Sequence, residues 1–353
     1  MSPELLPDGV RANLFDGVYA GRRVLVTGNT GFLGGWTARW LAALGADVAG
    51  YSRGGADGGA WPVTYRGDIT DPAAVTAAVD GFAPEIIVHL AGQATVVAGF
   101  RSPLSAFAAN VVGTGAVLDA AVHQPATRAV VVIGSPASVD VDDALELNPY
   151  PASKLATEVI VGAFAHPRTR AVSGRSQPLG LGVARPGVML GGDWAEGRLL
   201  ADVVRSVRAG EPVVLRAPGA VRPWQHVLDG VSGALLLGAR LYAGNPPRRR
   251  YEFGRPDPTS AEPVQAVVTR FLAALGRPDY PLRIEGHGGD RVELGAAAAQ
   301  AELGWAPVWD LDTTLTKAAQ WYSAAPAEAD GPVVDRTIAA YSHGALSRTL
   351  VRT

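Results

Sequence analysis

The chain has 353 residues, long enough to bury a large core, and carries 31 Lys and Arg against 33 Asp and Glu, a formal net charge of -2. This near balance excludes a global electrostatic attraction to nucleic acid or to an anionic membrane surface. The absence of cysteine excludes disulfides and thiolate sites, and the six histidines lack ligand spacing, so we expect no metal. The polar start carries no signal-peptide pattern, and no apolar stretch approaches the roughly 20 residues that span a bilayer, which predicts a cytoplasmic protein.

From Arg22 onward, short apolar segments alternate with longer helical patterns. Near-continuous apolar residues predict buried parallel strands at Arg23–Thr27, Asp47–Ser52, Glu85–Leu90 and Arg128–Ile133. Helices are predicted between them at Phe32–Leu44, Pro72–Asp80 and Pro103–His123, followed by a helix at Tyr150–Phe164 and a strand at Gly182–Arg185. This alternation predicts an α/β fold built on a Rossmann-type doubly wound parallel sheet.

After Pro186 the pattern changes to loops rich in polar and aromatic residues, GGDWAEGR and LRAPGAVRPWQHV, around a helix at Leu199–Ala209. Tyr251–Gly254 is predicted as a late strand that returns to the sheet, and the last predicted helix is Leu311–Tyr322. We therefore expect an NAD(P)-binding Rossmann domain at 1–186, a smaller C-terminal substrate-binding lobe over most of 187–323, and a C-terminal tail at 324–353.

A glycine-rich turn directly follows the first strand and opens the first helix; it consists of Gly28, Asn29, Thr30, Gly31, Phe32, Leu33 and Gly34. Gly28 permits the tight turn, Gly31 lets the backbone approach a pyrophosphate, and Gly34 allows close packing of helix on strand. The helix N-terminus adds N–H donors and a positive dipole end for phosphate. With a strand before it and a helix after it, this turn predicts a bound dinucleotide.

The choice between NAD and NADP depends on the end of the second strand, where NAD binders commonly place an acidic residue. Here Ser52 and Arg53 occupy that place, a pair suited to a 2′-phosphate, which favours NADP without excluding NAD. The alternative is that Arg53 merely opens a solvated loop or stacks on the adenine. Further cofactor contacts are predicted from Asp68 and Ile69, after a third strand that lies between Ser52 and Asp68, and from Leu90, Ala91 and Gly92, at the end of the fourth strand, Glu85–Leu90.

Tyr150 and Lys154 are spaced to lie on one face of a helix, one turn apart. Lys154 can then stabilise the Tyr150 phenolate and bind the nicotinamide ribose, while Tyr150 takes a proton from a sugar hydroxyl as hydride leaves. Ser135, at the end of the fifth strand, would hydrogen-bond the same hydroxyl. These three residues predict a catalytic site for hydride transfer.

Several segments together resemble the extended short-chain dehydrogenase/reductases that act on nucleotide sugars, and among them the CDP-glucose 4,6-dehydratases most. They are GRRVLVTGNTGFLGGW, GDITDPAAV, PEIIVHLAGQATV, YPASK, ARPGVMLGGDWAEGRLLADVVRS and AVRPWQHVLDGVSGALLLGARLY. The resemblance runs from about Phe15 to Tyr322. It implies a nicotinamide cofactor, a nucleotide-sugar substrate with a CDP-linked hexose, and a homodimer.

The same resemblance exposes a gap at Pro136 and Ala137. In the dehydratases an acid and a base directly follow the active-site serine or threonine, and proline and alanine carry no transferable proton. The favoured interpretation is therefore an epimerase or ketoreductase that keeps hydride transfer at C4. In the first alternative, dehydration survives through the loop acids Asp140, Asp142, Asp143 or Glu146; in the second, the chain is a non-catalytic nucleotide-sugar-binding homologue.

The predicted substrate contacts fall in three groups. Gln93, Thr95 and Asn110 follow the fourth strand and should lie near the hexose, Asn110 with its side chain bridging backbone groups as in the resembling enzymes. Arg216 and Arg222 are candidates for the diphosphate, because guanidinium binds phosphate oxygens in pairs. The remaining contacts are predicted from Asp193, Trp194, Arg198 and Trp224, with core packing as the alternative for the tryptophans.

Overall fold

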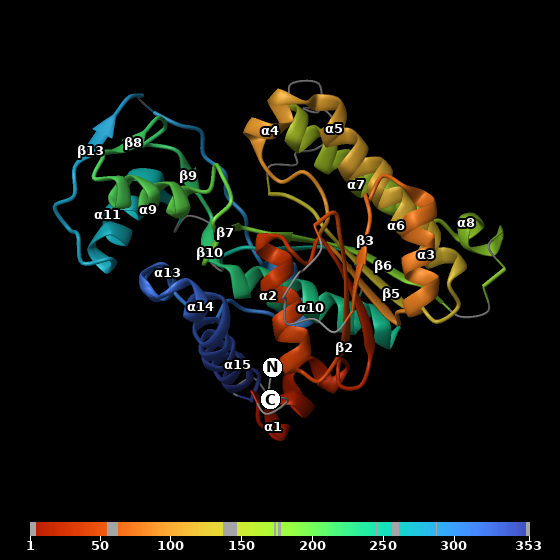
Figure 1. Ribbon diagram of the computed structural model, residues 1–353. Helices are drawn as coiled ribbons and strands as arrows, with labels where there is room; N and C mark the ends of the chain where they lie inside the picture. The colour runs from red at the N-terminus through yellow and green to blue at the C-terminus, as the bar shows by residue number, and fades with distance from the viewer. Residues whose placement is uncertain are drawn as a thin grey trace. The chain divides into compact units, whose positions relative to one another are not determined.

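The computed structural model describes residues 5–54, 63–136, 147–172, 174–175, 178–244, 246, 248–255, 261–286 and 288–350 (Figure 1). They form two compact units. The first unit comprises Met1–Arg185 and Val231–Tyr251, and the second comprises Pro186–Gly230 and Glu252–Thr353.

A seven-stranded sheet organises the first unit, in the order β11-β6-β5-β4-β1-β2-β3. The strands are β1 (Arg23–Thr27), β2 (Asp47–Ser52), β3 (Val63–Arg66), β4 (Ile86–His89), β5 (Ala129–Ile133), β6 (Gly180–Pro186) and β11 (Arg250–Phe253). Strands β1 to β6 pair in parallel. The predicted doubly wound parallel sheet is therefore confirmed, and the late strand at 251–254 does join it.

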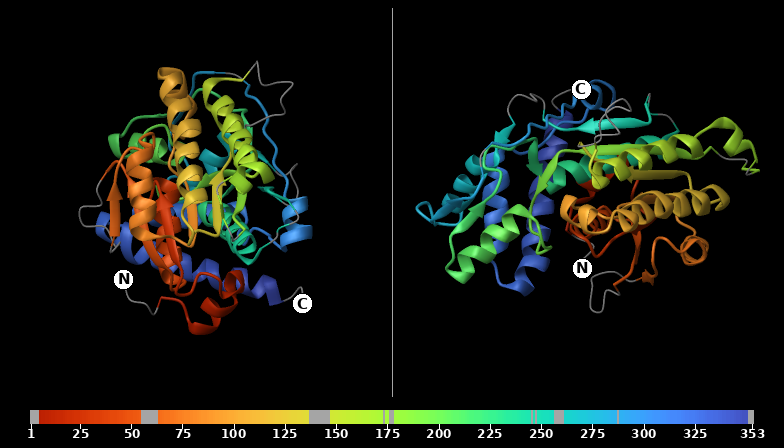
Figure 2. Two further views of the ribbon diagram at one scale, coloured as in Figure 1. Left: turned by 90° about the vertical axis from the view of Figure 1, so that its right-hand side faces the viewer. Right: turned by 90° about the horizontal axis from the view of Figure 1, so that it is seen from above.

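Helices cover both faces of this sheet. They are α1 (Asp8–Asn13), η1 (Leu14–Gly17), α2 (Phe32–Ala43), α3 (Pro72–Phe82), α4 (Val96–Arg101), α5 (Pro103–Phe107), η2 (Ala108–Val112), α6 (Gly113–His123), α7 (Pro149–Phe164), α8 (Pro167–Val172) and α10 (Val227–Ala243). Helices α3, α6 and α7 form one layer, seen face-on at the left of Figure 2, and pack on strand residues such as Leu25, Ile87 and Val130. On the other face α2 packs on β1 and β2, and α10 approaches Val131 at Gly238.

The longest helical run of this layer corrects the expectation that no apolar stretch of the chain is long enough to span a bilayer. Segments α5, η2 and α6 continue from Pro103 to His123, and these 21 residues are long and apolar enough to cross a membrane by length and composition. The helix packs on the sheet beside α3 and α7, and Val117 and Leu118 are fully buried. Its apolar character is therefore that of a core helix.

The described residues of the second unit form three two-stranded sheets with helices around them. Its elements are β7 (Val188–Leu190), α9 (Leu199–Ala209), β8 (Val213–Leu215), β9 (Val221–Arg222), β10 (Trp224–His226), β12 (Glu262–Pro263), α11 (Val264–Ala274), β13 (Leu282–Ile284), α12 (Ala297–Leu303), α13 (Leu311–Ser323), α14 (Pro326–Glu328), η5 (Ala329–Val333) and α15 (Val334–Leu350). Strands β7 and β10 pair in parallel, as do β8 and β13, whereas β9 and β12 are antiparallel.

The sequence predicts no element after Tyr322, yet α15 fills most of that stretch. Val334, Ile338 and Tyr341 are buried at helical spacing, which gives α15 an apolar face. The Tyr341 hydroxyl donates to Asp229 Oδ1 at 2.6 Å, and both side chains are fully buried. The C-terminal segment is thus part of the packed structure of the second unit.

Candidate active site

The glycine turn between β1 and α2 has a shape that only glycine permits. Gly28 has φ +71°, and a Cβ there would lie 2.8 Å from the backbone N of Ala91. A Cβ on Gly34 would lie 2.0 Å from the Gly28 carbonyl oxygen. Helix α2 begins after Gly31, and no side chain of the described residues caps it. An uncapped helix N-terminus behind a glycine cradle fits a dinucleotide pyrophosphate.

The other residues of the turn divide into exposed and buried positions. Thr30 and Gly31 are exposed, and Phe32 and Leu33 are half-buried in the first turn of α2. Asn29 is buried, with its side-chain amide against Gly50, where a Cβ would lie 2.2 Å from Asn29 Nδ2. Asn29 therefore packs against β2.

The end of β2 presents the residues predicted to choose between NAD and NADP. Ser52 is buried and its hydroxyl donates to the Gly54 carbonyl at 2.5 Å, whereas Arg53 is exposed. Asp68 Oδ1 accepts hydrogen bonds from the backbone N and the hydroxyl of Thr70, at 2.9 and 2.8 Å. These bonds, and then the positive charge of Arg53, lower the pKa of Asp68. An exposed arginine beside the adenosine end of the turn is available for a phosphate.

Ile69, Leu90, Ala91 and Gly92 complete the predicted cofactor residues. Ile69 is buried, and its Cγ2 atom occupies the space that a side chain on Gly113 would need. Leu90 and Ala91 donate their backbone N–H groups to Thr27 Oγ1, each at 3.1 Å. Gly92 is exposed, at the point where the chain leaves β4.

Helix α7 brings Tyr150 and Lys154 to the end of β5. The side chain of Asn148 caps the helix by accepting the Tyr150 N–H at 3.2 Å, and Pro149 opens it. The Lys154 ammonium donates to the Ile133 carbonyl at 3.0 Å. Ser135 follows two residues later and is 3% exposed. All three predicted catalytic residues thus lie at the carboxyl edge of the sheet, in the same unit as the glycine turn.

Burial dominates the electrostatics of Lys154. The pKa of its half-buried side chain falls to about 8, while the negative charge of Glu158, one turn later, raises it. Glu158 forms an ion pair with Arg185, and their side chains are 7% and 8% exposed. Neither partner follows from the Tyr-to-Lys spacing that identified the site.

Asn110 in η2 holds the floor of this region. Its Oδ1 accepts the Gln93 N–H at 2.8 Å, and its Nδ2 donates to the Gln93 carbonyl at 3.2 Å and to Ser153 Oγ at 2.8 Å. Ser153 in turn donates to the Tyr150 carbonyl at 2.8 Å. The π-helical turn at Ala108–Val112 is a local distortion of the kind often found at functional sites.

A buried histidine that the sequence analysis does not single out links this floor to the glycine turn. Thr27 Oγ1 accepts two backbone N–H bonds, so its own proton goes to His89 Nδ1, 2.8 Å away. His89 Nε2 must then carry the ring proton and donate to Thr114 Oγ1 at 3.0 Å. Thr114 donates to the Asn110 carbonyl. Burial lowers the pKa of His89 to about 3, so the ring stays neutral and the direction of the chain is set.

Gln93 and Thr95 lie on the segment that joins β4 to α4. The Gln93 side-chain amide donates to the Thr95 carbonyl, and Thr95 Oγ1 caps α4 by accepting the Ala98 N–H at 3.2 Å. Gly99 of α4 lies against α7, where a Cβ would come within 3.2 Å of Tyr150 Cβ. Close packing of α4 on the start of α7 therefore positions Tyr150.

The two residues that stand in place of the dehydratase acid and base lie at the edge of a described segment. Pro136 is described and half-buried. Ala137 and the four loop acids Asp140, Asp142, Asp143 and Glu146 lie outside the described residues.

In the second unit, the loop with Asp193 and Trp194 packs on α13. The Trp194 ring centroid lies 5.8 Å from that of Trp321 and 5.1 Å from that of Tyr322, and Arg208 stacks over Trp194 at 4.6 Å. Tyr322 donates its hydroxyl to the Asp193 carbonyl at 2.6 Å. Asp193 Oδ2 and Arg198 Nε lie 3.2 Å apart. Trp194 remains 38% exposed, so part of its ring is open to solvent.

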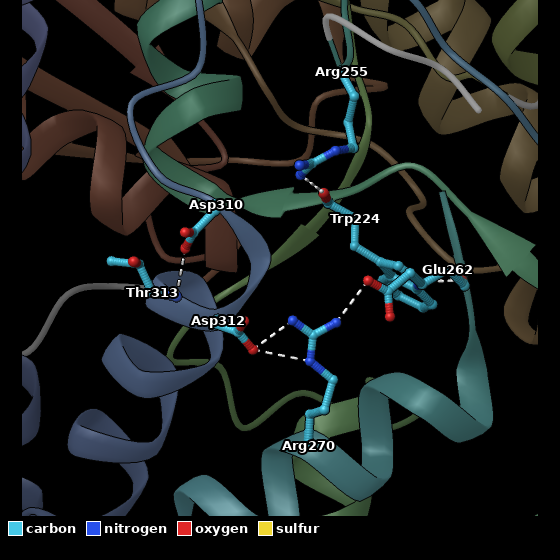
Figure 3. Close-up of polar contacts among 7 residues, drawn as sticks. All are labelled: Trp224, Arg255, Glu262, Arg270, Asp310, Asp312 and Thr313. Atoms are coloured by element: carbon cyan, nitrogen blue, oxygen red, sulfur yellow. Dashed lines mark hydrogen bonds and ion pairs between the residues drawn. The ribbon is translucent and has the colours of Figure 1, made fainter. Parts of the chain in front are cut away.

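Arg222 and Trp224 lie on β9 and β10, which follow one another in the chain and belong to different two-stranded sheets of this unit. Arg222 pairs with Asp290, Nη2 to Oδ1 at 2.6 Å. Trp224 is 4% exposed and donates its indole N–H to the Glu262 carbonyl at 2.7 Å, as Figure 3 shows. Its ring packs inside the unit, and contact with a substrate stays a prediction. Arg216, after β8, is exposed.

Figure 3 also shows what supports these strands. Arg270 of α11 bridges Glu262, at 2.6 Å from Nη1 to Oε1, and Asp312, at 2.9 Å from Nε to Oδ1. Arg255 donates to the Trp224 carbonyl at 3.2 Å. These contacts tie β10 and β12 to α11 and α13.

Comparison with known proteins gives a consistent set of relatives. The NAD dependent epimerase/dehydratase family matches residues 24–254. CDP-glucose 4,6-dehydratase of Salmonella typhimurium is 31% identical over 334 residues, which cover 87% of this chain and 92% of that protein. UDP-glucose 4-epimerase of Mycolicibacterium smegmatis is 27% identical over 331 residues, covering 85% of this chain and 98% of that protein.

Solved structures show the same fold. UDP-glucose 4-epimerase of Thermus thermophilus, in complex with NAD, superimposes with a TM-score of 0.71 at 22% identity, covering 86% of this chain and 99% of that one. DesIV of Streptomyces venezuelae, a dTDP-glucose 4,6-dehydratase with NAD bound, gives 0.71 at 23% identity, with 85% and 96% covered.

Proposed function

Because this chain belongs to the NAD dependent epimerase/dehydratase family, we propose that it oxidises the C4 hydroxyl of a nucleotide-linked hexose with NAD or NADP. Membership confirms the resemblance drawn from the sequence motifs and the prediction of a nicotinamide dinucleotide cofactor. The observation that carries the proposal is the placement of Tyr150 and Lys154 on α7, where Lys154 reaches the Ile133 carbonyl at the end of β5.

The protein residues divide the work of proton and charge transfer. The backbone of the glycine turn and the N-terminus of α2 hold the pyrophosphate. The bound nicotinamide supplies a hydride acceptor for C4. Tyr150 removes the proton of the C4 hydroxyl, the Lys154 cation stabilises the phenolate, and Ser135 donates a hydrogen bond to the same oxygen.

We favour an epimerase or ketoreductase over a dehydratase. Elimination of the C6 hydroxyl needs a base for the C5 proton and an acid for the leaving group. Pro136 and Ala137, in the two positions after Ser135, carry no proton that can be transferred. Return of hydride to C4 needs neither group, so this chemistry is still within reach of Tyr150, Lys154 and Ser135.

The second candidate is CDP-glucose 4,6-dehydratase itself. It is supported by the 31% identity to the Salmonella typhimurium enzyme over most of both chains. In that case one of the acids Asp140, Asp142, Asp143 and Glu146 supplies the missing acid–base groups. A CDP-linked hexose is the first substrate to test under either candidate.

The nucleotide end of the substrate is assigned to the second unit. We propose that Arg222 and Arg216 bind its diphosphate, since arginine makes paired bonds to phosphate oxygens. Trp194, with 38% of its surface exposed, is the aromatic candidate for stacking. Asp193 and Arg198, which form an ion pair, are the remaining candidates for substrate contact.

We further propose that two chains associate through an apolar face on the first unit. This face consists of Val97 and Phe100 of α4, Leu104 of α5, Val112 of η2 and Val159 of α7, each more than half exposed. Helices α4, α5 and α7 pack against one another (Figure 1). A cluster of exposed apolar side chains of this kind is typical of a protein–protein interface.

The test uses CDP-glucose deuterated at C4, with NAD and with NADP, and follows products by mass spectrometry and NMR. Inversion at C4, or transfer of the deuterium from C4 to the cofactor, without loss of water supports the favoured function. Tyr150→Phe should reduce the rate by roughly 10²–10⁴-fold, the usual contribution of a general base. Tyr65→Phe, on β3 of the same unit, is the matched control and should keep the rate.

Loss of water to give a 4-keto-6-deoxy sugar would replace the favoured function by the second candidate. Asp140→Ala and Glu146→Ala would then identify the acid that acts. If cofactor binds but CDP-glucose shows no inversion at C4, no transfer of deuterium to the cofactor and no 4-keto product, the proposed C4 oxidation is wrong.

A further inference from the structure

A buried ion pair lies directly beneath the end of β5. Arg185 Nε and Nη2 donate to Glu158 Oε1 and Oε2 at 2.6 and 2.7 Å, a two-point pairing. The side chains are only 8% and 7% exposed. Arg250 Nη1 lies 3.5 Å from Glu158 Oε2. Burying two charges is costly unless they are paired in this way, and removing one leaves the other uncompensated.

The pair lies against the residues that form the catalytic edge. A Cβ on Gly134 would come within 2.8 Å of Glu158 Oε1 and 3.0 Å of Arg185 Cγ. Gly134 lies between Ile133 and Ser135 in the chain, and the Ile133 carbonyl accepts a hydrogen bond from the Lys154 ammonium. Three consecutive residues thus contact the lysine, contact the ion pair and carry the predicted catalytic hydroxyl.

Helix geometry places Glu158 next to Lys154. Tyr150, Lys154 and Glu158 are spaced four residues apart on α7 and share one face. Glu158 therefore places a negative charge one helical turn after Lys154. Arg185 fixes the position of this charge, because it binds both carboxylate oxygens.

The charged and titratable groups around Lys154 come from four elements. Tyr150 and Glu158 belong to α7, His89 comes from β4, and Arg185 and Arg250 lie on β6 and β11 beyond Glu158. His89 is neutral, because burial lowers its pKa to about 3. Burial pulls the pKa of Lys154 down to about 8 and Glu158 opposes this. Glu158 is thus the anion among these described groups.

We propose that Glu158, held by Arg185, is a positioning residue whose charge keeps Lys154 protonated beside Tyr150. This rests on the role proposed above for Lys154. Burial lowers the pH at which an ammonium loses its proton, and a neutral lysine no longer stabilises a phenolate. Glu158 acts only through Lys154.

The two partners should have opposite effects when each loses its charge. Glu158→Gln keeps the size of the side chain but leaves the Arg185 cation unbalanced, so Lys154 should lose its proton at lower pH. Arg185→Gln leaves the carboxylate of Glu158 less neutralised, so Lys154 should keep its proton to higher pH. A purely structural role would not give shifts of opposite sign.

The lysine content of the chain makes the measurement direct. Lys154 and Lys317 are the two lysines in 353 residues. Protein made with ¹³C-labelled lysine therefore shows two side-chain Cε resonances, assigned with Lys317→Arg, and Lys317 then serves as an internal reference. The titration uses the full chain without substrate or cofactor.

We expect the Lys154 midpoint to fall by about one pH unit in Glu158→Gln and to rise in Arg185→Gln. Glu158→Asp, which keeps the charge, should stay close to the wild-type midpoint. Midpoints that are unchanged, or that move in the same direction in both neutral variants, would overturn the proposal. If Arg185→Gln does not fold, Glu158→Gln still decides, because an unchanged or higher midpoint contradicts it.

The inference and the proposed function fail in different ways. Midpoints that shift as expected in a protein without C4 chemistry would support the electrostatic role and overturn the function. C4 chemistry that depends on Tyr150, together with a Lys154 midpoint that is the same in the variants, would support the function and overturn the electrostatic role. In an active protein, the alkaline limb of the kcat profile should move with the NMR midpoint while KM changes little.

Discussion

Arg222 and Asp290 form an ion pair in the second unit, with Nη2 and Oδ1 2.6 Å apart. Arg222 also donates from Nη1 to the Asp290 carbonyl at 3.0 Å. The Asp290 side chain is 71% exposed and that of Arg222 is 24% exposed. The guanidinium that we assign to the substrate diphosphate is therefore already neutralised by a carboxylate at the surface.

Removing that carboxylate should strengthen binding of CDP. Exposed ion pairs are worth about 0.2–1 kcal/mol, so Asp290→Asn should lower the Kd of CDP by about 1.4-fold to fivefold. Isothermal titration calorimetry measures this, with Asp312→Asn as the matched control because Asp312 pairs with Arg270 instead. Weaker binding in Asp290→Asn would mean that the carboxylate holds Arg222 in its binding position.

Arg53 should set the preference for NADP. It is exposed at the end of β2, and its positive charge reaches Asp68. Arg53→Ala should weaken NADPH binding by about tenfold, the loss expected for one charge-assisted bond to phosphate, and leave NADH binding nearly unchanged. Fluorescence titration with both cofactors measures the ratio. Arg168→Ala, exposed on α8 of the same unit, is the control, and equal effects on both cofactors in Arg53→Ala would refute the assignment.

A charge on the apolar face should separate a dimer into single chains. Leu104 is 82% exposed, the highest value among the large apolar side chains described. Leu104→Glu would place a carboxylate inside the proposed interface, where burying an unpaired charge is costly. Light scattering after size exclusion should then report one chain instead of two. Ile284→Glu, at a 42% exposed apolar position of the second unit, should leave the mass unchanged; a wild-type monomer would exclude the interface.

Loss of the Tyr341 hydroxyl should destabilise the protein more at high pH than at low pH. Burial raises the pKa of Asp229 to about 6, above the value near 3.9 in an unfolded chain, so the folded protein binds the proton more tightly. The free energy of unfolding therefore falls as pH rises from about 4 to about 6. Above pH 6 the carboxylate is charged and depends on its donors, which are Tyr341, the Val308 N–H and the His226 N–H.

Tyr341→Phe should accordingly cost about 1.5–3 kcal/mol at pH 8, the usual worth of a hydrogen bond to a charged group, and less at pH 5. Urea unfolding at the two pH values measures the difference. Tyr280→Phe is the matched control, because Tyr280 donates to the uncharged carbonyls of Ser206 and Glu211. A pH-independent loss in Tyr341→Phe would show that Asp229 is not the group that titrates.

Features confined to one element could be predicted from the sequence. The glycines at 28, 31 and 34 and the four-residue spacing of Tyr150 and Lys154 are local patterns, and local backbone geometry decides what they form. Helix α9 has the predicted bounds, Leu199–Ala209, because its apolar residues recur at helical spacing. Strands β1, β2, β4 and β5 are near-continuous apolar segments and lie where the sequence predicts them, whereas β3 is not such a segment and no range is predicted for it.

The C-terminal segment shows where local patterns stop being sufficient. The sequence predicts a tail at 324–353, with no helix or strand assigned to it. Helix α15 is ordered there because Tyr341 and Ile338 are buried in the second unit and Tyr341 reaches Asp229, 112 residues earlier in the chain.

The chemistry that we propose for the first unit is predicted from short stretches of sequence: a glycine turn for a dinucleotide, a tyrosine and a lysine on one helix face, and a serine followed by residues without protons to transfer. The groups that surround them depend on the folded chain. Glu158 meets Arg185 across 27 residues, Thr27 meets His89 across 62, and Arg222 meets Asp290 across 68. The order of the strands and the packing of the helices bring these residues together in space. The spacing of residues within a single element does not predict such contacts.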